Sequence, residues 1–129
     1  MSQNHKQTVR ASVLTVPSTV TQVMSNNDAS GMILVVDATT VVATGTLTPS
    51  ITITGDADTT SATLWTAAAA IAAAGIKVYY FYPQGVDTVA GALTGVTERL
   101  SVSIPNKFTV SFLVQTANVT FSATIYWLV

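Results

Sequence analysis

The stretch that decides the fold is the C-terminal segment Lys107–Val129, KFTVSFLVQTANVTFSATIYWLV. Apolar and polar residues alternate along both of its halves, which flank the short run Thr116-Ala117-Asn118. Because successive side chains on a strand point to opposite faces, this alternation predicts two strands that each bury one face. The tight connection predicts that they form a β-hairpin. The positions predicted to face the core are Phe108, Val110, Phe112, Val114, Val119, Phe121, Ala123, Ile125 and Trp127.

Similar patterns predict further strands upstream. Met32–Val36 is continuously apolar, which is typical of a central strand covered on both faces. Pro17 separates the first two predicted strands and indicates an edge strand or a corner there. The predicted ranges are Val9–Val16, Thr19–Met24, Met32–Val36, Ser50–Thr54, Ile76–Tyr82 and Arg99–Ile104.

The alanine-rich segment Ala62–Ala74 is ambiguous between strand and helix. Alanine is the best helix former, but Thr63 and Thr66 are poor helix residues and Gly75 ends the run. We therefore predict a strand over about Leu64–Ala69, followed by a turn or a single helical turn, and keep a short helix as the alternative.

Glycine, proline and asparagine recur at short intervals between these segments, as in all-β domains. Asp87–Gly95 has little periodicity and is predicted to be a long surface loop. The fold prediction is an antiparallel β-sandwich, jelly-roll-like, with about eight strands and an extended N-terminal arm. Residues 1–8 are assigned to a flexible arm and residues 9–129 to a single β-sandwich domain.

The composition points to a subunit of an assembly. Hydrophobic residues make up 49% of the 129 residues and charged residues only 9%, against roughly 25% charged in typical soluble domains. The five cations are scattered, which argues against nucleic-acid binding. The apolar runs are too short for a membrane span, and the polar N-terminus lacks a signal-peptide pattern. We therefore expect synthesis in the cytoplasm, with no membrane partner.

Catalytic chemistry is hard to assemble from this sequence. The chain has no cysteine and one histidine, His5, which lies in the polar N-terminal stretch. The one close pair of carboxylates, Asp56 and Asp58, follows Gly55 and is typical of a turn. A calcium loop is the alternative there, but it needs more oxygen ligands than the local sequence offers. The prediction is a protein that is not an enzyme and has no metal and no cofactor.

Several aromatic residues fit either packing or recognition. Tyr80 and Tyr82 share one face of their predicted strand, and Trp65 lies in the alanine-rich segment. Aromatic rings fill cores and subunit interfaces, which is the favoured interpretation. A flat platform for binding a sugar is the alternative.

Four segments resemble small structural proteins of tailed bacteriophages. They are Gly31–Val41, in which a glycine precedes a buried strand that ends in Asp37 and is followed by threonines; Pro49–Gly55; Leu64–Ile71 with the turn at Gly75; and Ile104–Phe108. The resemblance covers residues 31–129. It departs at the short turn Gly55–Thr60 and in the alanine run.

This resemblance implies a capsid decoration or cement protein located on the virion surface. Its partner would be the major capsid protein, and it would act as a homo-oligomer, with a homotrimer favoured. The family has no catalytic motif to carry over. The N-terminal segment Met1–Val16, which is polar at first and then strand-forming, is a candidate contact element that could add a strand to a neighbour. The candidate interface residues are Val9, Arg10, Val13, Trp65, Tyr80 and Tyr82. The alternatives are a carbohydrate-binding β-sandwich and a head-fibre or tail subunit.

Overall fold

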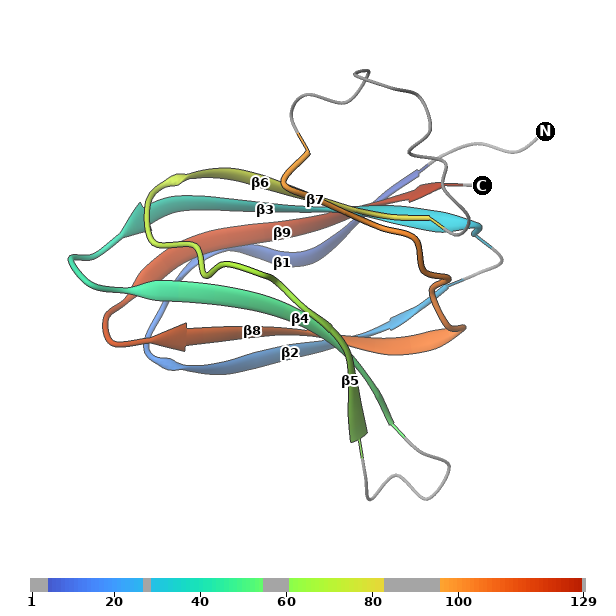
Figure 1. Ribbon diagram of the computed structural model, residues 1–129. Coiled ribbons are helices and arrows are strands. Elements are labelled where there is room, and N and C mark those ends of the chain that lie inside the picture. The colour runs from blue at the N-terminus through green and yellow to red at the C-terminus, as the bar shows by residue number, and fades with distance from the viewer. Residues whose placement is uncertain (1–4, 27–28, 55–60, 83–95, 129) are drawn as a thin grey trace.

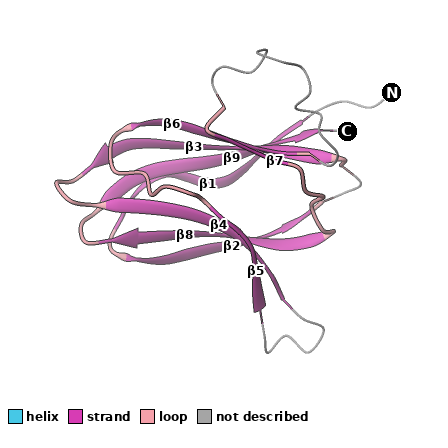
Figure 2. Cartoon of the chain, viewed as in Figure 1, coloured by secondary structure: helices cyan, strands magenta, loops and turns pink. Residues whose placement is uncertain are grey.

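The computed structural model describes residues 5–26, 29–54, 61–82 and 96–128. These residues form strands joined by loops, and no helix occurs among them, as Figure 2 shows. The strands are β1 (His5–Thr15), β2 (Ser18–Ser25), β3 (Gly31–Val41), β4 (Thr46–Thr54), β5 (Ser61–Thr66), β6 (Gly75–Phe81), β7 (Glu98–Leu100), β8 (Lys107–Gln115) and β9 (Val119–Leu128).

The strands make two sheets that pack face to face (Figure 1). The five-stranded sheet has the order β1-β9-β3-β6-β7, and the four-stranded sheet has the order β2-β8-β4-β5. The antiparallel pairs β1–β9, β2–β8, β3–β6 and β4–β5 trace one long ribbon that folds over itself. That is the arrangement of a jelly roll, with the short parallel strand β7 added beside β6. The prediction of an antiparallel, jelly-roll-like β-sandwich is confirmed.

The predicted C-terminal hairpin is wrong, although both of its strands exist. β8 lies in the four-stranded sheet and β9 in the five-stranded sheet, so their connection crosses from one layer to the other. Thr116 adopts a left-handed backbone conformation in this connection, with φ at 73°. Alternation decides which face of a strand is buried, but it does not decide which strand lies beside it.

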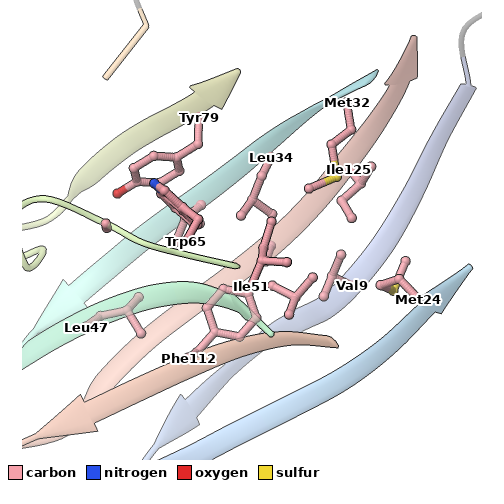
Figure 3. Close-up of a cluster of buried hydrophobic side chains, with 14 of the residues drawn as sticks. Val9, Met24, Met32, Leu34, Leu47, Ile51, Trp65, Tyr79, Phe112 and Ile125 are labelled. Atoms are coloured by element: carbon pink, nitrogen blue, oxygen red, sulfur yellow. The ribbon is translucent and has the colours of Figure 1, made fainter. Parts of the chain in front are cut away.

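The core lies between the two sheets and is built from the inward positions of the strands (Figure 3). Phe112 of β8 meets Phe121 of β9 across the layers, with ring centroids 5.1 Å apart. Phe108 and Trp127 make a second contact between the same strands at 6.1 Å. All nine residues that the alternation assigned to the core are buried.

The alanine-rich segment resolves into a strand and an irregular connection, with no helix. β5 ends at Thr66, before the predicted limit at Ala69. The chain then stays bound to β4, because Leu47 and Ile71 exchange backbone hydrogen bonds of 2.9 and 2.8 Å. Ala67 and Ile71 are buried as anchors, so tertiary contacts override the helix propensity of alanine.

Two boundaries differ from the sequence prediction. Residues 5–8, which the sequence prediction assigned to the flexible arm, belong to β1, which pairs with β9 from Trp127 onward; residues 1–4 of that prediction lie outside the described residues. The strand predicted over Arg99–Ile104 is reduced to Glu98–Leu100, although Ile104 still packs in the core. The predicted loop Asp87–Gly95 lies outside the described residues.

Candidate binding surface

The outward side of the five-stranded sheet carries an apolar region over β6 and the first half of β3, and β9 adds Tyr126 to it but otherwise presents the hydroxyl residues Thr120, Ser122 and Thr124. Along one row, Tyr80 of β6 lies beside Ile33 of β3, which lies beside Tyr126 of β9. The next row places Val78 beside Val35. Ile76 continues the outward side of β6 and is 62% exposed, and Tyr126 is 41% exposed. We call Ile33, Val35, Ile76, Val78, Tyr80 and Tyr126 the apolar outer face.

Charged groups flank this face and are sparse within it. Arg99 of β7 lies beside Tyr80, and Lys6 of β1 lies beside Tyr126, so the tyrosine row has a cation at each end. Asp37 of β3 pairs with Ile76, near the end of the apolar region. Aromatic centres with few charges are the composition that distinguishes protein interfaces from ordinary surface.

The outward side of the four-stranded sheet has a different chemistry. Its outward positions on β2, β8, β4 and β5 are mostly hydroxyl residues, with Val23, Leu64 and Leu113 as exposed apolar exceptions and Lys107 at one end. Threonine on a strand faces water without losing β-propensity. We call this set the hydroxyl face: Thr19, Thr21, Thr48, Ser50, Thr52, Thr63, Thr66, Thr109 and Ser111.

The candidate interface residues predicted from sequence do not form one site. Tyr80 and Tyr82 are together, with ring centroids 6.5 Å apart and planes tilted by 31°. Val13 is exposed on the far edge of the same sheet, on β1. Val9 is buried in the core, so its side chain is not open to a partner.

Arg10 and Trp65 also face inward. The Arg10 guanidinium lies 5.1 Å from the centroid of the buried Phe121 ring, and its Nη2 donates to Thr15 Oγ1 at 2.6 Å. Trp65 is 8% exposed and packs edge-on against Tyr79 and Phe81. Its indole therefore has little surface to offer to a capsid protein or a sugar.

The sequence analysis did not single out Ile33, Val35 and Tyr126. Ile33 and Val35 belong to the continuous apolar run Met32–Val36, for which two-sided cover was predicted. The structure buries Met32, Leu34 and Val36 against the other sheet, whereas Ile33 and Val35 remain partly exposed. Within the described chain, then, the run has one covered face and one open face. An apolar run whose second face is left partly exposed is the sequence feature that could have pointed to a binding surface.

A polar cluster beside this surface is occupied by structural hydrogen bonds. Glu98 accepts a bond from Trp65 Nε1 at 3.1 Å and one from the Ala68 backbone N–H at 2.7 Å. Burial, together with the nearby Glu98 carboxylate, raises the pKa of Tyr79 to about 12. Glu98 thus ties β7 to the connection that follows β5.

The other residues that the sequence analysis considered for chemistry are His5, Asp56 and Asp58. His5 is the first residue of β1, beside Trp127 in the ladder. Asp56 and Asp58, the alternative calcium loop, lie outside the described residues. Within the described ranges, no group of three histidine, aspartate or glutamate residues could hold a metal ion. That part of the chain also contains no helix able to cross a membrane.

Comparison with family models, with curated proteins and with solved structures finds no match to this chain. The two outer faces are therefore the features that bear on its function.

Proposed function

We propose that this protein is a non-enzymatic structural component of a phage virion that binds and stabilises the capsid. The observation that carries the proposal is the contrast between the two outer faces of the sandwich. The five-stranded sheet carries a continuous aromatic and aliphatic region beside the hydroxyl residues of β9, whereas the four-stranded sheet carries mostly hydroxyl residues with single apolar side chains among them. A protein that decorates a shell needs one side that binds the shell and one side that faces water.

The apolar outer face is the proposed contact with the major capsid protein. Its aromatic centre would supply buried contact area, and Lys6 at one end of the tyrosine row favours a partner with an acidic group beside an apolar patch. A module that binds one shell conformation more tightly than another stabilises that conformation by the difference in binding free energy. The resemblance to phage proteins implies that this protein would be a homotrimer when it is bound to the capsid.

The test is co-sedimentation with expanded capsids of the encoding phage, assembled without this protein. We expect saturable binding and greater survival of the shells on heating. Absence of binding by demonstrably folded protein would contradict the capsid proposal.

A matched pair of variants locates the contact. Tyr126→Ser truncates a side chain that is 41% exposed on β9, and Leu113→Ser truncates one that is 37% exposed on β8. Loss of one anchor residue costs at least about ten-fold in affinity, or 1.4 kcal/mol. We expect that loss for Tyr126→Ser and unchanged binding for Leu113→Ser; the reverse order would place the contact on the hydroxyl face.

A second function, carbohydrate binding, has one observation in its favour. Tyr80, on the outward side of β6, and Tyr82, just after the strand, form an adjacent ring pair. Both tryptophans are buried, so their fluorescence is a poor reporter of sugar at this surface. Calorimetric titration with glycans is the appropriate measurement, and heat that disappears in Tyr80→Ala would support this alternative.

A further inference from the structure

β2 is an edge strand without the usual protection against pairing. Among the described residues β8 is its one strand partner, and the register runs from Ser18 to Ser25 without a shift. The strand, STVTQVMS, contains no charge and no proline. Natural sheets usually protect such edges with lysine, proline or bulges, because unpaired N–H and C=O groups bind other strands.

The other edge strands differ from β2 in this respect. β1 carries Lys6 and Arg10, and its register with β9 shifts twice. The register of β5 with β4 shifts once, between Ile51 and Thr52, and β7 spans only Glu98–Leu100. Protection is therefore weakest at β2.

The hydrogen bonds of β4 reveal which backbone groups of β2 are free. Leu47 and Pro49 direct their backbone groups away from β8, toward Ile71 and Ala67. In an antiparallel sheet the N–H and C=O of one residue point to the same side, and the side alternates along the strand. Thr48 and Ser50 therefore bond to their β8 partners Leu113 and Ser111.

The same alternation carries across β8 to β2. Phe112 and Val110, which lie between those partners, point toward Val20 and Gln22 of β2. The backbone groups left facing the open edge belong to the alternate residues of β2, namely Thr19, Thr21, Val23 and Ser25. Their side chains lie on the outward side of the sheet.

We propose that β2 pairs antiparallel with β2 of a second copy, about a two-fold axis, so that the two four-stranded sheets become one continuous sheet. Two-fold pairing is self-complementary, since each free donor meets the equivalent acceptor of the other copy. An axis at Gln22 places Thr21 opposite Val23 and Thr19 opposite Ser25 of the other copy. This register uses all the free residues of the strand.

The chemistry of β2 suits a second copy. The strand carries no charge, so pairing it with itself opposes no like charges. The side chain of Gln22 donates to the carbonyl of Val23 at 3.2 Å in the single chain. In the pair, the backbone N–H of Thr21 from the other copy would take that acceptor. Val23, which is 54% exposed, would gain a cross-strand neighbour.

The first test is the mass of the free protein by sedimentation equilibrium, without capsids, so it is independent of the proposed function. We expect a dimer whose dissociation constant rises at least about ten-fold in Thr21→Pro. That substitution removes an edge-facing N–H, while the bonds from β2 to β8 stay in place. Thr21→Val keeps the N–H and is the matched control, expected to remain dimeric. A monomer or a trimer, or a dimer indifferent to Thr21→Pro, would overturn the proposal.

A cross-linking test gives a result even if the proline variant fails to fold. The natural chain has no cysteine, so a single introduced thiol reports only on the pairing. Gln22→Cys places the two sulfurs opposite each other at the axis, in a position with Cα atoms about 4.5 Å apart. We expect a disulfide-linked dimer from Gln22→Cys and little from Thr21→Cys. Efficient linkage through Thr21→Cys alone would shift the axis by one residue, and linkage through neither would overturn the pairing.

Discussion

At the scale of single residues, one of the few charged side chains, Glu98, connects the two sheets. Glu98 is partly buried and accepts hydrogen bonds from both Trp65 and the Ala68 backbone. Carboxylate hydrogen bonds are about twice as strong as neutral ones. One residue thereby fastens β7 and β5, which lie in different sheets.

Removal of this carboxylate should destabilise the fold. Glu98→Ala leaves the Trp65 indole N–H, within the core, without its partner, so we expect a loss of about 1–3 kcal/mol in the free energy of unfolding. Glu98→Gln keeps one acceptor oxygen and should lose less. Urea unfolding of the two variants checks the order, and equal stability of wild type and Glu98→Ala would refute the role of Glu98.

Because the pKa of Tyr79 is raised in the folded protein, we expect the protein to lose stability in alkali. Its pKa is raised from 10.0 to about 12 in the folded protein, first by burial and then by Glu98. The unfolded chain therefore releases this proton first, and stability falls as the pH rises from 10 to 12. The loss is on the order of 2 to 3 kcal/mol. Denaturant unfolding across this pH range should show a shallower decline for Tyr79→Phe, which keeps the ring but cannot ionise; an identical decline would contradict the assignment.

At the scale of elements, the start of β3 lies very close to the end of β6. A Cβ on Gly31 would overlap the carbonyl oxygen of Phe81 and would lie 2.9 Å from Tyr82 Cδ2. The glycine is required by this close approach of two backbones. Two residues further along β3, Ile33 lies beside Tyr80 on the apolar outer face.

Gly31→Ala should therefore cost more than an alanine usually does in a strand. Overpacking of this kind destabilises by about 1–3 kcal/mol. Gly45→Ala is a milder comparison, because its Cβ would meet the Val42 carbonyl oxygen at 3.0 Å. Thermal unfolding of both variants measures the difference, and a Gly31→Ala protein as stable as wild type would show that the strands can move apart.

At the scale of the whole molecule, β1 closes one edge of the five-stranded sheet. It is paired with β9 in the same chain, and Trp127 Nε1 donates to Gln7 Oε1 at 3.0 Å. Within the described residues β1 is paired on one side only, so a role in adding a strand to a neighbour would use its other edge.

This arrangement changes how an N-terminal deletion must be interpreted. Removing residues 1–10 takes away buried Val9 and much of β1, so we expect at least about 2 kcal/mol of lost stability. Removing residues 1–4 keeps every described pairing of β1 and is the control. Capsid binding and melting temperature should be measured for both, since binding lost only with stability would argue against a direct contact by β1.

The sequence alone determined the class of fold and the inward positions. Period-two alternation in β8 and β9, and the apolar run in β3, are sufficient for that, because the side-chain period of a strand is fixed by its backbone. Local pattern alone left the alanine-rich segment ambiguous, since a short run of apolar residues fits a strand or a helix equally well.

Only the tertiary structure decided which strands are neighbours, and therefore which surfaces exist. β8 and β9 adjoin in sequence yet lie in different sheets, and Tyr80, Ile33 and Tyr126 meet only because β6, β3 and β9 are side by side. The sequence could name Tyr80 but not its neighbours, and it placed buried Trp65 among the candidates for an interface. Pairing across long chain separations depends on the packing of the whole core, which no local pattern of residues contains.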